Sequence, residues 1–335
     1  MRNLSAASKF SELEPDGERV AVGFRPSGEL HVGNLLSIVY AAVIAEKLEL
    51  ELDLMCCDTD WSAHIHENHK PENSDVMKLF FQRDCGCDER KSEIFSEEKT
   101  SRKVFDRHEN VAEHRVAEIM PFLEGLEETL EVEVDVNYLS DLEGDEEYVD
   151  ALRTVLKNMD EFDEVFGGGF RRRYRSPVVN VCGCGFSHSK GAAFSERTDE
   201  LVFACRNEEC PEGFASGKLS GRIGVYYLVD PVRDPSRNVA VHVFGGDYRD
   251  AEKEQKTPKV EKVAKITELA TGETPEYFLA PMIVDEDGKP LSKSKGTGKT
   301  VSEIDDLEGF GRKLVRKVEE WIGEEKRFVA QEEVF

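Results

Sequence analysis

Basic residues are scarce in this chain. Its 335 residues include 69 aspartates and glutamates but 44 lysines and arginines, which leaves a formal net charge of −25 at pH 7. An acidic surface repels phosphate-rich ligands, so the composition excludes nucleic-acid binding over a broad basic face and confines it to a local patch. The charge itself is typical of a solvated surface suited to a salt-rich cytoplasm, where electrostatic interactions are screened over short distances.

Long apolar runs are also missing. The chain has no apolar stretch of the roughly 20 residues needed to cross a bilayer. The residues from Met1 to Ser8 lack the apolar core of a secretory signal peptide. We therefore expect a cytoplasmic protein that spans no membrane.

The N-terminal part predicts a strand, a turn, a helix and a second strand. Residues Arg19–Phe24 have the composition of a buried strand, and the turn 25–28 follows them. Over residues 32–44 apolar residues recur at the spacing of one helical face, and 50–57 is again strand-like. A βαβ unit of this kind favours a parallel sheet that is covered on both faces.

The middle of the chain predicts an interruption of that sheet. Residues 99–167 are rich in glutamate and helical in pattern, with strand character only at 130–136. Between about 170 and 224 the composition changes to glycines, four cysteines and three consecutive arginines. This change indicates a small insertion.

The second half of the sheet is predicted after the insertion. Strand-like segments occur at 239–244 and 278–284, and a helix at 258–270 between them ends near Gly272, a typical C-cap residue. From Val301 the tail is charged and helical in pattern. The expected fold class is therefore α/β, a Rossmann-like doubly wound parallel sheet split by an insertion.

The junction between the first strand and the first helix carries a motif that suits a nucleotide. Such a junction lies at the carboxyl edge of the sheet, where the start of the helix offers unpaired N–H groups and partial positive charge to an anion. Gly33 would let a ligand approach the backbone, while His31 and Asn34 supply donors that do not neutralise a triphosphate. A tight turn with an ordinary surface histidine is the alternative. The motif comprises Pro26, Ser27, Gly28, His31, Gly33 and Asn34.

A second motif follows the last predicted strand, within residues 285–296. Serines and lysines alternate at Ser292, Lys293, Ser294 and Lys295, and a glycine closes the run. A cationic loop of this kind can neutralise a leaving pyrophosphate, and the loss of one such donor costs on the order of 10²–10³ in rate. In isolation the same residues also suit a solvated surface loop.

Together, in this order along the chain, the two motifs resemble the HIGH and KMSKS signatures of the class I aminoacyl-tRNA synthetases. The first motif ends in Asn34, a variant familiar from the class I lysyl-tRNA synthetases. Lys293 takes the place of the second lysine of the KMSKS signature, and Pro290 stands where its first lysine is expected. Segments similar to the lysyl branch are also found at 148–160, 217–222 and 242–248, so the likeness covers about residues 18–300.

The resemblance implies an ATP-dependent ligase with a HUP-type Rossmann-like core and a helical, zinc-binding insertion that contacts the tRNA acceptor stem. ATP with Mg²⁺ and an amino acid, lysine in the lysyl branch, would give an aminoacyl-adenylate and pyrophosphate, followed by transfer to a tRNA 3′ end. The implied domains are the two halves of the catalytic domain at 1–115 and 223–284, and the insertion at 116–222. The last domain, at 285–335, combines the second motif within residues 285–296, which we call the lysine loop, with a helical tail.

By the same resemblance, His31, Asn34 and Lys293 would be the catalytic residues. His31 and Asn34 would hold the phosphates and adenosine, Lys293 the β- and γ-phosphates, and the turn 245–247 the adenosine. The implied ATP-binding residues are Pro26, Ser27, Gly28, His31, Gly33, Asn34, Gly245, Gly246, Asp247, Ser292, Lys293, Ser294 and Lys295.

Two aspartates at the end of the second strand are candidates for the amino-acid site. Asp58 and Asp60 fall at the ligand edge of the sheet, where a carboxylate can pair with a cation such as the lysine ammonium. Aspartate is also a preferred helix N-cap, so capping of a helix at 61–64 is the alternative.

Paired cysteines predict a structural zinc ion. In a reducing compartment such pairs indicate metal binding rather than disulfides, and four thiolates from two tight loops fit tetrahedral zinc. Reduced, buried cysteines are the alternative, and His188 is another candidate ligand. The zinc ligands would be Cys182, Cys184, Cys205 and Cys210. A second metal site stays open at Cys56, Cys57, Cys85 and Cys87.

One dense basic run stands out in this acidic chain, and two aromatic residues accompany it. Arginines beside aromatic rings can neutralise phosphates and stack on unpaired bases, as an RNA acceptor end requires. Binding of neighbouring acidic helices is the alternative. The run contains Arg171, Arg172, Arg173 and Arg175.

Two further functions stay open beside tRNA charging. Lysyl enzymes continue after the lysine loop into a large helical anticodon-binding part, whereas this chain continues only briefly. A paralog that passes its activated amino acid to another acceptor would need no such part. A nucleotide-binding regulator without turnover is the other possibility.

Overall fold

The computed structural model describes residues 10–26, 30–58, 111–142, 144–165, 180–181, 187–188, 193–195, 197–198, 200–204, 214–218, 229–248, 259–291, 299–324 and 326–335. Its centre is a five-stranded sheet of order β10-β9-β1-β2-β3, in which every neighbouring pair is parallel. The strands are β1 (Arg19–Phe24), β2 (Glu51–Cys56), β3 (Val136–Tyr138), β9 (Val239–Phe244) and β10 (Glu276–Leu279).

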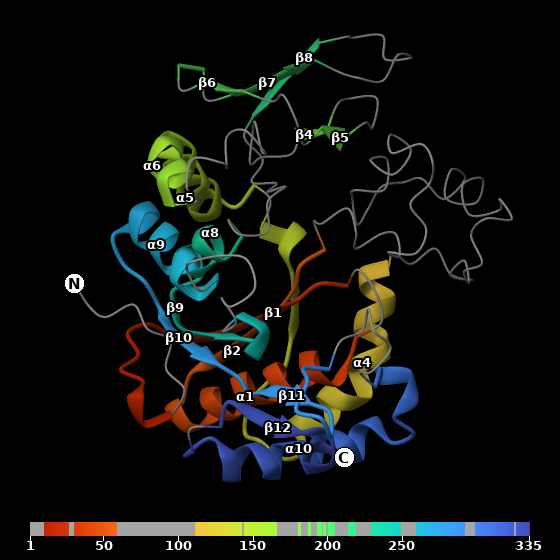
Figure 1. Ribbon diagram of the computed structural model, residues 1–335. Coiled ribbons are helices and arrows are strands. Elements are labelled where there is room, and N and C mark those ends of the chain that lie inside the picture. Colours follow the sequence, from red (N-terminus) through yellow and green to blue (C-terminus); the bar gives the residue numbers. More distant parts are fainter. Residues whose placement is uncertain are drawn as a thin grey trace, which may run out of the picture.

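Helices cover both faces of this sheet (Figure 1). On one face lie α1 (Val32–Leu48), α4 (Val111–Glu127) and α10 (Leu307–Trp321), whose apolar residues share one core with Val22 of β1 and Leu54 of β2. On the other face lie α5 (Glu146–Lys157), α8 (Val229–Ser236) and α9 (Lys259–Thr271), which pack around Met55 of β2. The predicted α/β fold, a doubly wound parallel sheet, is therefore confirmed.

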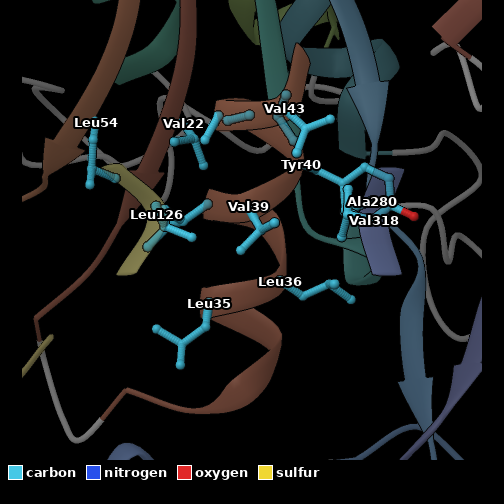
Figure 2. Close-up of a cluster of buried hydrophobic side chains, with 14 of the residues drawn as sticks. Val22, Leu35, Leu36, Val39, Tyr40, Val43, Leu54, Leu126, Ala280 and Val318 are labelled. Atoms are coloured by element: carbon cyan, nitrogen blue, oxygen red, sulfur yellow. The ribbon is translucent and has the colours of Figure 1, made fainter. Parts of the chain in front are cut away.

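Helix α1 is the centre of the larger core. Its apolar residues from Val32 to Ala45 are buried on nearly every side, because β1, β2, α4 and α10 surround it. Figure 2 shows Leu35, Leu36, Val39, Tyr40 and Val43 of this helix beside residues of the sheet and of the other two helices. A helix buried all round holds its N-terminus in a fixed position relative to the strands.

The predicted strand at 278–284 is wrong in one respect, because it is two strands in two sheets. β10 ends the central sheet, whereas β11 (Met282–Val284) pairs in parallel with β12 (Phe328–Ala330). The last ladder bond to β9 is donated by Ala280 to Phe244 over 2.9 Å, and Pro281 follows. Since proline has no N–H to donate, the chain leaves the sheet there.

The strand character expected at 130–136 is displaced along the chain. Residues 132–135 are not in a strand, and β3 begins at Val136. After β3 come the short helix η4 (Leu139–Leu142), α5, α6 (Met159–Val165) and small antiparallel strands. These strands are β4 (Asn180–Val181), β5 (Ser187–His188), β6 (Ala193–Ser195), β7 (Glu200–Ala204) and β8 (Phe214–Lys218).

Most of helix α4 and all of strand β3 fall within 116–222, the range that the sequence assigns to the insertion. Both belong to the layers of the central sheet, since β3 pairs with β2 and α4 packs against α10. In the described part of the chain the interruption of the sheet therefore starts after Tyr138. No helix among the described residues is long and apolar enough to cross a membrane.

Candidate functional site

The order of the strands places a crevice at the carboxyl ends of β1 and β9. From β1 the chain proceeds through α1 to β2 on one side, while β9 lies on the other side of β1 and leads to β10. In open parallel sheets such a reversal is where ligands bind, outside the strand ends. The segment after Phe24 leads to His31, and the segment after Phe244 is the 245–247 turn. The structure thus brings these two sequence motifs to the same edge.

His31 and Asn34 form a reciprocal cap at the start of α1. The Gly33 N–H donates to His31 Nδ1 over 3.1 Å, and the His31 N–H donates to Asn34 Oδ1 over 3.1 Å. Because Nδ1 of His31 accepts, the proton of the neutral ring lies on Nε2. Because Oδ1 of Asn34 accepts, the amide nitrogen of its side chain is left as a donor. The first turn of α1 contains no acidic residue, so no carboxylate there repels an anion.

The expectation of unpaired N–H groups at this helix start is wrong. Val32 donates to the Lys299 carbonyl over 3.2 Å, Gly33 donates to the His31 ring, and Asn34 donates to the His31 carbonyl over 2.8 Å. These hydrogen bonds use the backbone donors that a bare helix end would present. An anion at this end would be met mainly by side chains.

Gly33 is required by the histidine cap. A Cβ atom at this position would lie 2.9 Å from Cε1 and 3.0 Å from Nδ1 of His31. The His31 ring fills the place that a side chain at position 33 would take. The approach of a nucleotide to this glycine stays a prediction.

The segment that follows the lysine loop is hydrogen-bonded to the start of α1. Thr300 forms a β-bridge with His31, and Lys299 and Val301 make backbone bonds to Val32 and Leu30, the latter at 2.9 Å. On the upstream side, the N–H of Leu291 donates to Ile283 of β11 over 3.0 Å. The loop residues Ser292, Lys293, Ser294 and Lys295 lie outside the described residues. Their downstream neighbours nevertheless fix one end of the loop beside His31.

The turn after β9 is shaped by the chain's own backbone. A Cβ atom at Gly246 would lie 2.6 Å from the Met282 nitrogen and 2.9 Å from the Ala280 carbonyl oxygen. Tyr248 donates to the Gly245 carbonyl over 3.0 Å, and its ring stacks on Phe244 at 4.5 Å. The close approach at Gly246 therefore serves the link between β10 and β11.

Asp58 is buried and hydrogen-bonded through both carboxylate oxygens. Oδ1 accepts from the N–H of Ser140 over 2.8 Å, and Oδ2 accepts from its hydroxyl over 2.7 Å. The carboxylate thus fastens η4 to the end of β2. Neither alternative weighed for Asp58 from the sequence included this partner.

Of the remaining predicted site residues, Pro26 is described and buried, and the others lie outside the described residues. This holds for Ser27, Gly28, Asp60, Arg171, Arg172, Arg173, Arg175, Cys182, Cys184, Cys205 and Cys210. Among the described residues there is no cluster of metal-ligating side chains. Burial raises the pKa of the Cys57 thiol to about 12.

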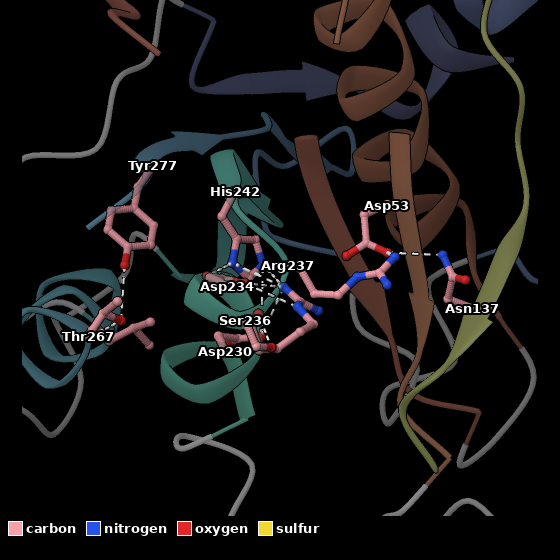
Figure 3. Close-up of polar contacts among 11 residues, drawn as sticks. Asp53, Asn137, Asp230, Asp234, Ser236, Arg237, His242, Thr267 and Tyr277 are labelled. Carbon is pink, nitrogen blue, oxygen red and sulfur yellow. Dashed lines mark hydrogen bonds and ion pairs between the residues drawn. The ribbon is translucent and has the colours of Figure 1, made fainter. Parts of the chain in front are cut away.

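A buried ionic network on the α8 face was missed by the sequence reasoning (Figure 3). Arg233 donates from Nη2 to Asp234 Oδ1 over 2.8 Å, and His242 Nδ1 lies 2.7 Å from Asp234 Oδ2. Asp230, one helical turn before Arg233, lies 3.5 Å from the guanidinium and 3.9 Å from His242 Nε2. The signal was present, because charged residues three and four positions apart share one face of a helix.

Burial and charge act differently on the two acids. Burial alone would raise the pKa of the Asp234 carboxyl, but His242 and Arg233 outweigh it and lower that pKa below the ordinary value. For Asp230 burial prevails over the same two neighbours, and its pKa is raised. Arg233 stays protonated, because Asp234 and Asp230 raise its pKa despite burial.

Because Gly23 has no side chain, the face of β1 that points toward α8 is accessible at this position. Gly23 is exposed although its neighbours Val22 and Phe24 are 1% and 3% exposed. A Cβ atom on Gly23 would lie 3.3 Å from Arg233 Nη1 and 3.5 Å from Cys57 Sγ. Nη1 of Arg233 is buried and has no hydrogen-bond partner among the described residues. An unpaired buried guanidinium nitrogen beside an exposed glycine marks a place where a polar ligand group can bind.

Solved structures similar to this chain are aminoacyl-tRNA synthetases. A putative arginyl-tRNA synthetase from Campylobacter jejuni has a TM-score of 0.36 and 14% identity over 91% of this chain and 63% of its own. A glutamate-tRNA ligase from Elizabethkingia meningosepticum has a TM-score of 0.40 and 14% identity, over 84% of this chain and 53% of its own. The tyrosyl-tRNA synthetase from Archaeoglobus fulgidus has a TM-score of 0.37 and 16% identity, over 86% and 62%.

These similarities are distant. The chain spans roughly half to three-fifths of the length of the synthetases it resembles, at 53% to 63%. No protein-family model and no curated protein sequence matches the chain. At such TM-scores the likeness does not establish a shared activity.

Proposed function

We propose that the protein activates an amino acid with ATP, forming an aminoacyl-adenylate and pyrophosphate, and transfers the aminoacyl group to the 3′ end of a tRNA. One observation carries this proposal: residues Lys299–Val301, directly after the lysine loop, bond to Leu30–Val32 at the crevice between β1 and β9. The first motif therefore lies beside the segment that follows the second motif, at the edge of the sheet where a nucleotide would bind.

The chemistry needs positioning and charge stabilisation more than a protein nucleophile. A carboxylate oxygen of the amino acid attacks the α-phosphorus, a new P–O bond forms, and the bond to pyrophosphate breaks. His31 Nε2–H and the Asn34 amide would donate to the phosphates, since Nδ1 and Oδ1 are occupied in the cap. Lys293 would stabilise the charge on the departing β- and γ-phosphates. Mg²⁺ bound with ATP would supply further positive charge.

Lysine is the amino acid that we propose, by the resemblance to the lysyl branch. Asp60 stays a candidate for its recognition. For Asp58 we propose a positioning role, because both of its oxygens are bonded to Ser140. The tRNA acceptor end would be bound by the arginine run at 171–175 and by a zinc-containing insertion, as the sequence pattern suggests.

The test is amino-acid-dependent exchange of labelled pyrophosphate into ATP, tried with each proteinogenic amino acid, with and without tRNA. We expect exchange with one amino acid, and its loss in Lys293→Ala. The exposed Lys289, which pairs with Asp287 over 2.9 Å, supplies the matched control Lys289→Ala. Exchange with no amino acid under either condition would refute activation and favour a nucleotide-binding regulator.

A second assay separates the acceptors. If exchange occurs, charging of tRNA is measured for the wild type and for a variant in which the four arginines of 171–175 are alanines. We expect the variant to retain exchange and lose charging. Exchange without charging of any tRNA in the wild type would instead indicate a different acceptor for the activated amino acid.

A further inference from the structure

Asp230 is a half-buried acid that has no hydrogen-bond donor among the described residues. It lies in the first turn of α8, its side chain is 14% exposed, and its nearest cations are Arg233 at 3.5 Å and His242 at 3.9 Å. Both distances exceed those of a hydrogen bond. No donor among the described residues comes closer. In the described part of the chain this carboxylate therefore has electrostatic neighbours but no partner that satisfies its oxygens.

The short hydrogen bonds of Arg233 go to Asp234, so Asp230 is left at longer distances from its cationic neighbours. Two carboxylates, Asp230 and Asp234, face one guanidinium, and Arg233 bonds Asp234 through both Nε and Nη2. A carboxylate whose oxygens lack hydrogen-bond donors is costly to bury, so a ligand that brings one positive charge and N–H donors would bind there favourably.

The network is reachable from the crevice. Exposed Gly23 lies on the same face, and the position that its missing Cβ would occupy is 3.3 Å from Arg233 Nη1. His242 precedes Phe244, the last residue of β9, by two positions, so it lies about 7 Å below the strand end at 3.3–3.4 Å per residue. His31 and Asn34 lie beyond the end of β1. A group held by Asp230 is thus deeper in the sheet than the phosphates would be.

We infer that Asp230 binds the cationic end of the substrate's side chain, a primary ammonium, while Arg233 Nη1 donates to a polar atom of the same substrate or to its water. The inference rests on the proposed function and names the recognition residue within it. An amino acid whose carboxylate reacts at the strand ends would extend its side chain away from these ends and into the sheet, toward Asp230. Arg233, Asp234 and His242 are positioning residues that hold this carboxylate in place.

The experiment compares L-lysine with L-norleucine, which has the same chain without the ammonium. Binding of each to the whole protein is measured by calorimetry, for the wild type and for Asp230→Asn. We expect the wild type to prefer lysine, and the variant to lose on the order of 30-fold or more in lysine affinity, as when one partner of a buried charge pair is removed. Its affinity for norleucine should stay as in the wild type.

Two further variants guard against a merely structural effect. Asp145→Asn removes an acid from another helix start, at α5, and should leave lysine binding unchanged. Gly23→Ala keeps Asp230 but places a methyl group beside Arg233 Nη1, and should weaken lysine binding as well. Asp230→Asn should unfold at the same urea concentration as the wild type or a higher one, because the carboxylate that it removes accepts no hydrogen bond from the described residues.

The outcomes distinguish this inference from the proposed function. Unchanged lysine affinity in Asp230→Asn overturns the inference. An equal loss of affinity for lysine and for norleucine also overturns it, because this result would place the α-ammonium at Asp230. Exchange of pyrophosphate with an amino acid that has no cationic side chain keeps the proposed function and overturns the inference. Lysine binding that depends on Asp230, without exchange, keeps the inference and overturns the proposed function.

Discussion

The N–H of Val32, the first residue of α1, donates a 3.2 Å hydrogen bond to the carbonyl of Lys299. This contact joins the helix that starts after the central strand to the segment that follows the lysine loop. The same hydrogen bond therefore holds both the His31 cap and the downstream end of the lysine loop. Changes at either end of this contact should therefore affect both.

Replacing His31 with alanine should lower both stability and activity. The variant loses the acceptor of the Gly33 N–H, and loss of a helix cap costs about 1 kcal/mol in the free energy of unfolding. It also loses a donor to the phosphates, so exchange should fall on the order of 10²-fold. Urea unfolding and pyrophosphate exchange measure the two effects.

Asp145→Ala is the matched control, since Asp145 Oδ1 caps α5 by accepting from Tyr148 over 2.9 Å. This variant should lose comparable stability and retain exchange. An equal loss of exchange in both variants would mean that His31 acts through stability alone.

Replacing Gly246 with alanine should destabilise the fold. The added Cβ would lie 2.6 Å from the backbone nitrogen of Met282, and overpacking of this kind costs about 1–3 kcal/mol. Gly323→Ala is the control, because nothing lies within 4 Å of a Cβ there. Thermal unfolding compares the two. A Gly246→Ala protein of normal stability but weakened ATP binding would show that the glycine serves the ligand.

Removal of the Asp234 carboxylate should be among the most damaging buried changes. Asp234→Asn leaves Arg233 buried without its nearest ion-pair partner, and breaking a buried pair costs about 3–5 kcal/mol. Because the pKa of Asp234 is lowered in the folded protein, its stabilisation is present above the ordinary value of 3.8 and is lost as the pH falls through the folded-state pKa. The stability difference between wild type and variant should therefore be full at neutral pH and shrink in acid. Urea unfolding at several pH values measures it, and a difference that grows toward acid would contradict the expected sign.

The thiol of Cys57 should react slowly in the native protein. Burial raises its pKa from 9.0 to about 12, so at pH 8 its thiolate fraction is roughly 10³-fold below that of an ordinary thiol. Alkylation by iodoacetamide, followed at this residue by mass spectrometry, should be correspondingly slow. The urea-unfolded protein supplies the reference rate. Equal rates in the two states would show that the thiol is not shielded.

Zinc should be lost when the insertion cysteines are changed. Cys182→Ser and Cys205→Ser each remove a thiolate from the predicted tetrahedral set, which needs all four positions. We expect about one zinc ion per chain in the wild type, and less in either variant, by atomic absorption. Cys57→Ser should keep the wild-type content. Equal zinc in every variant would exclude the proposed ligands.

The strands and the first helix could be predicted because their signals are local. A short apolar run rich in valine, such as Val239–Phe244, is typical of a buried strand, and the periodicity of 32–44 indicates a helix. The split at Pro281 was not predicted, although proline gives the signal, because the partner of β11 is the distant strand β12. The role of Asp58 was missed for the same reason, since Ser140 is remote in the sequence.

The sequence by itself determined the parallel sheet and the order of the two predicted nucleotide motifs, because apolar periodicity and short motifs are properties of neighbouring residues. Only the tertiary structure decided that Lys299 meets Val32, that the first N–H groups of α1 are already bonded, and that no described residue donates a hydrogen bond to Asp230. Each of these depends on which distant segments share one edge or one face of the sheet. Such tertiary neighbours determine which hydrogen bonds form and which charges are buried. The spacing of residues along the chain does not reveal these neighbours.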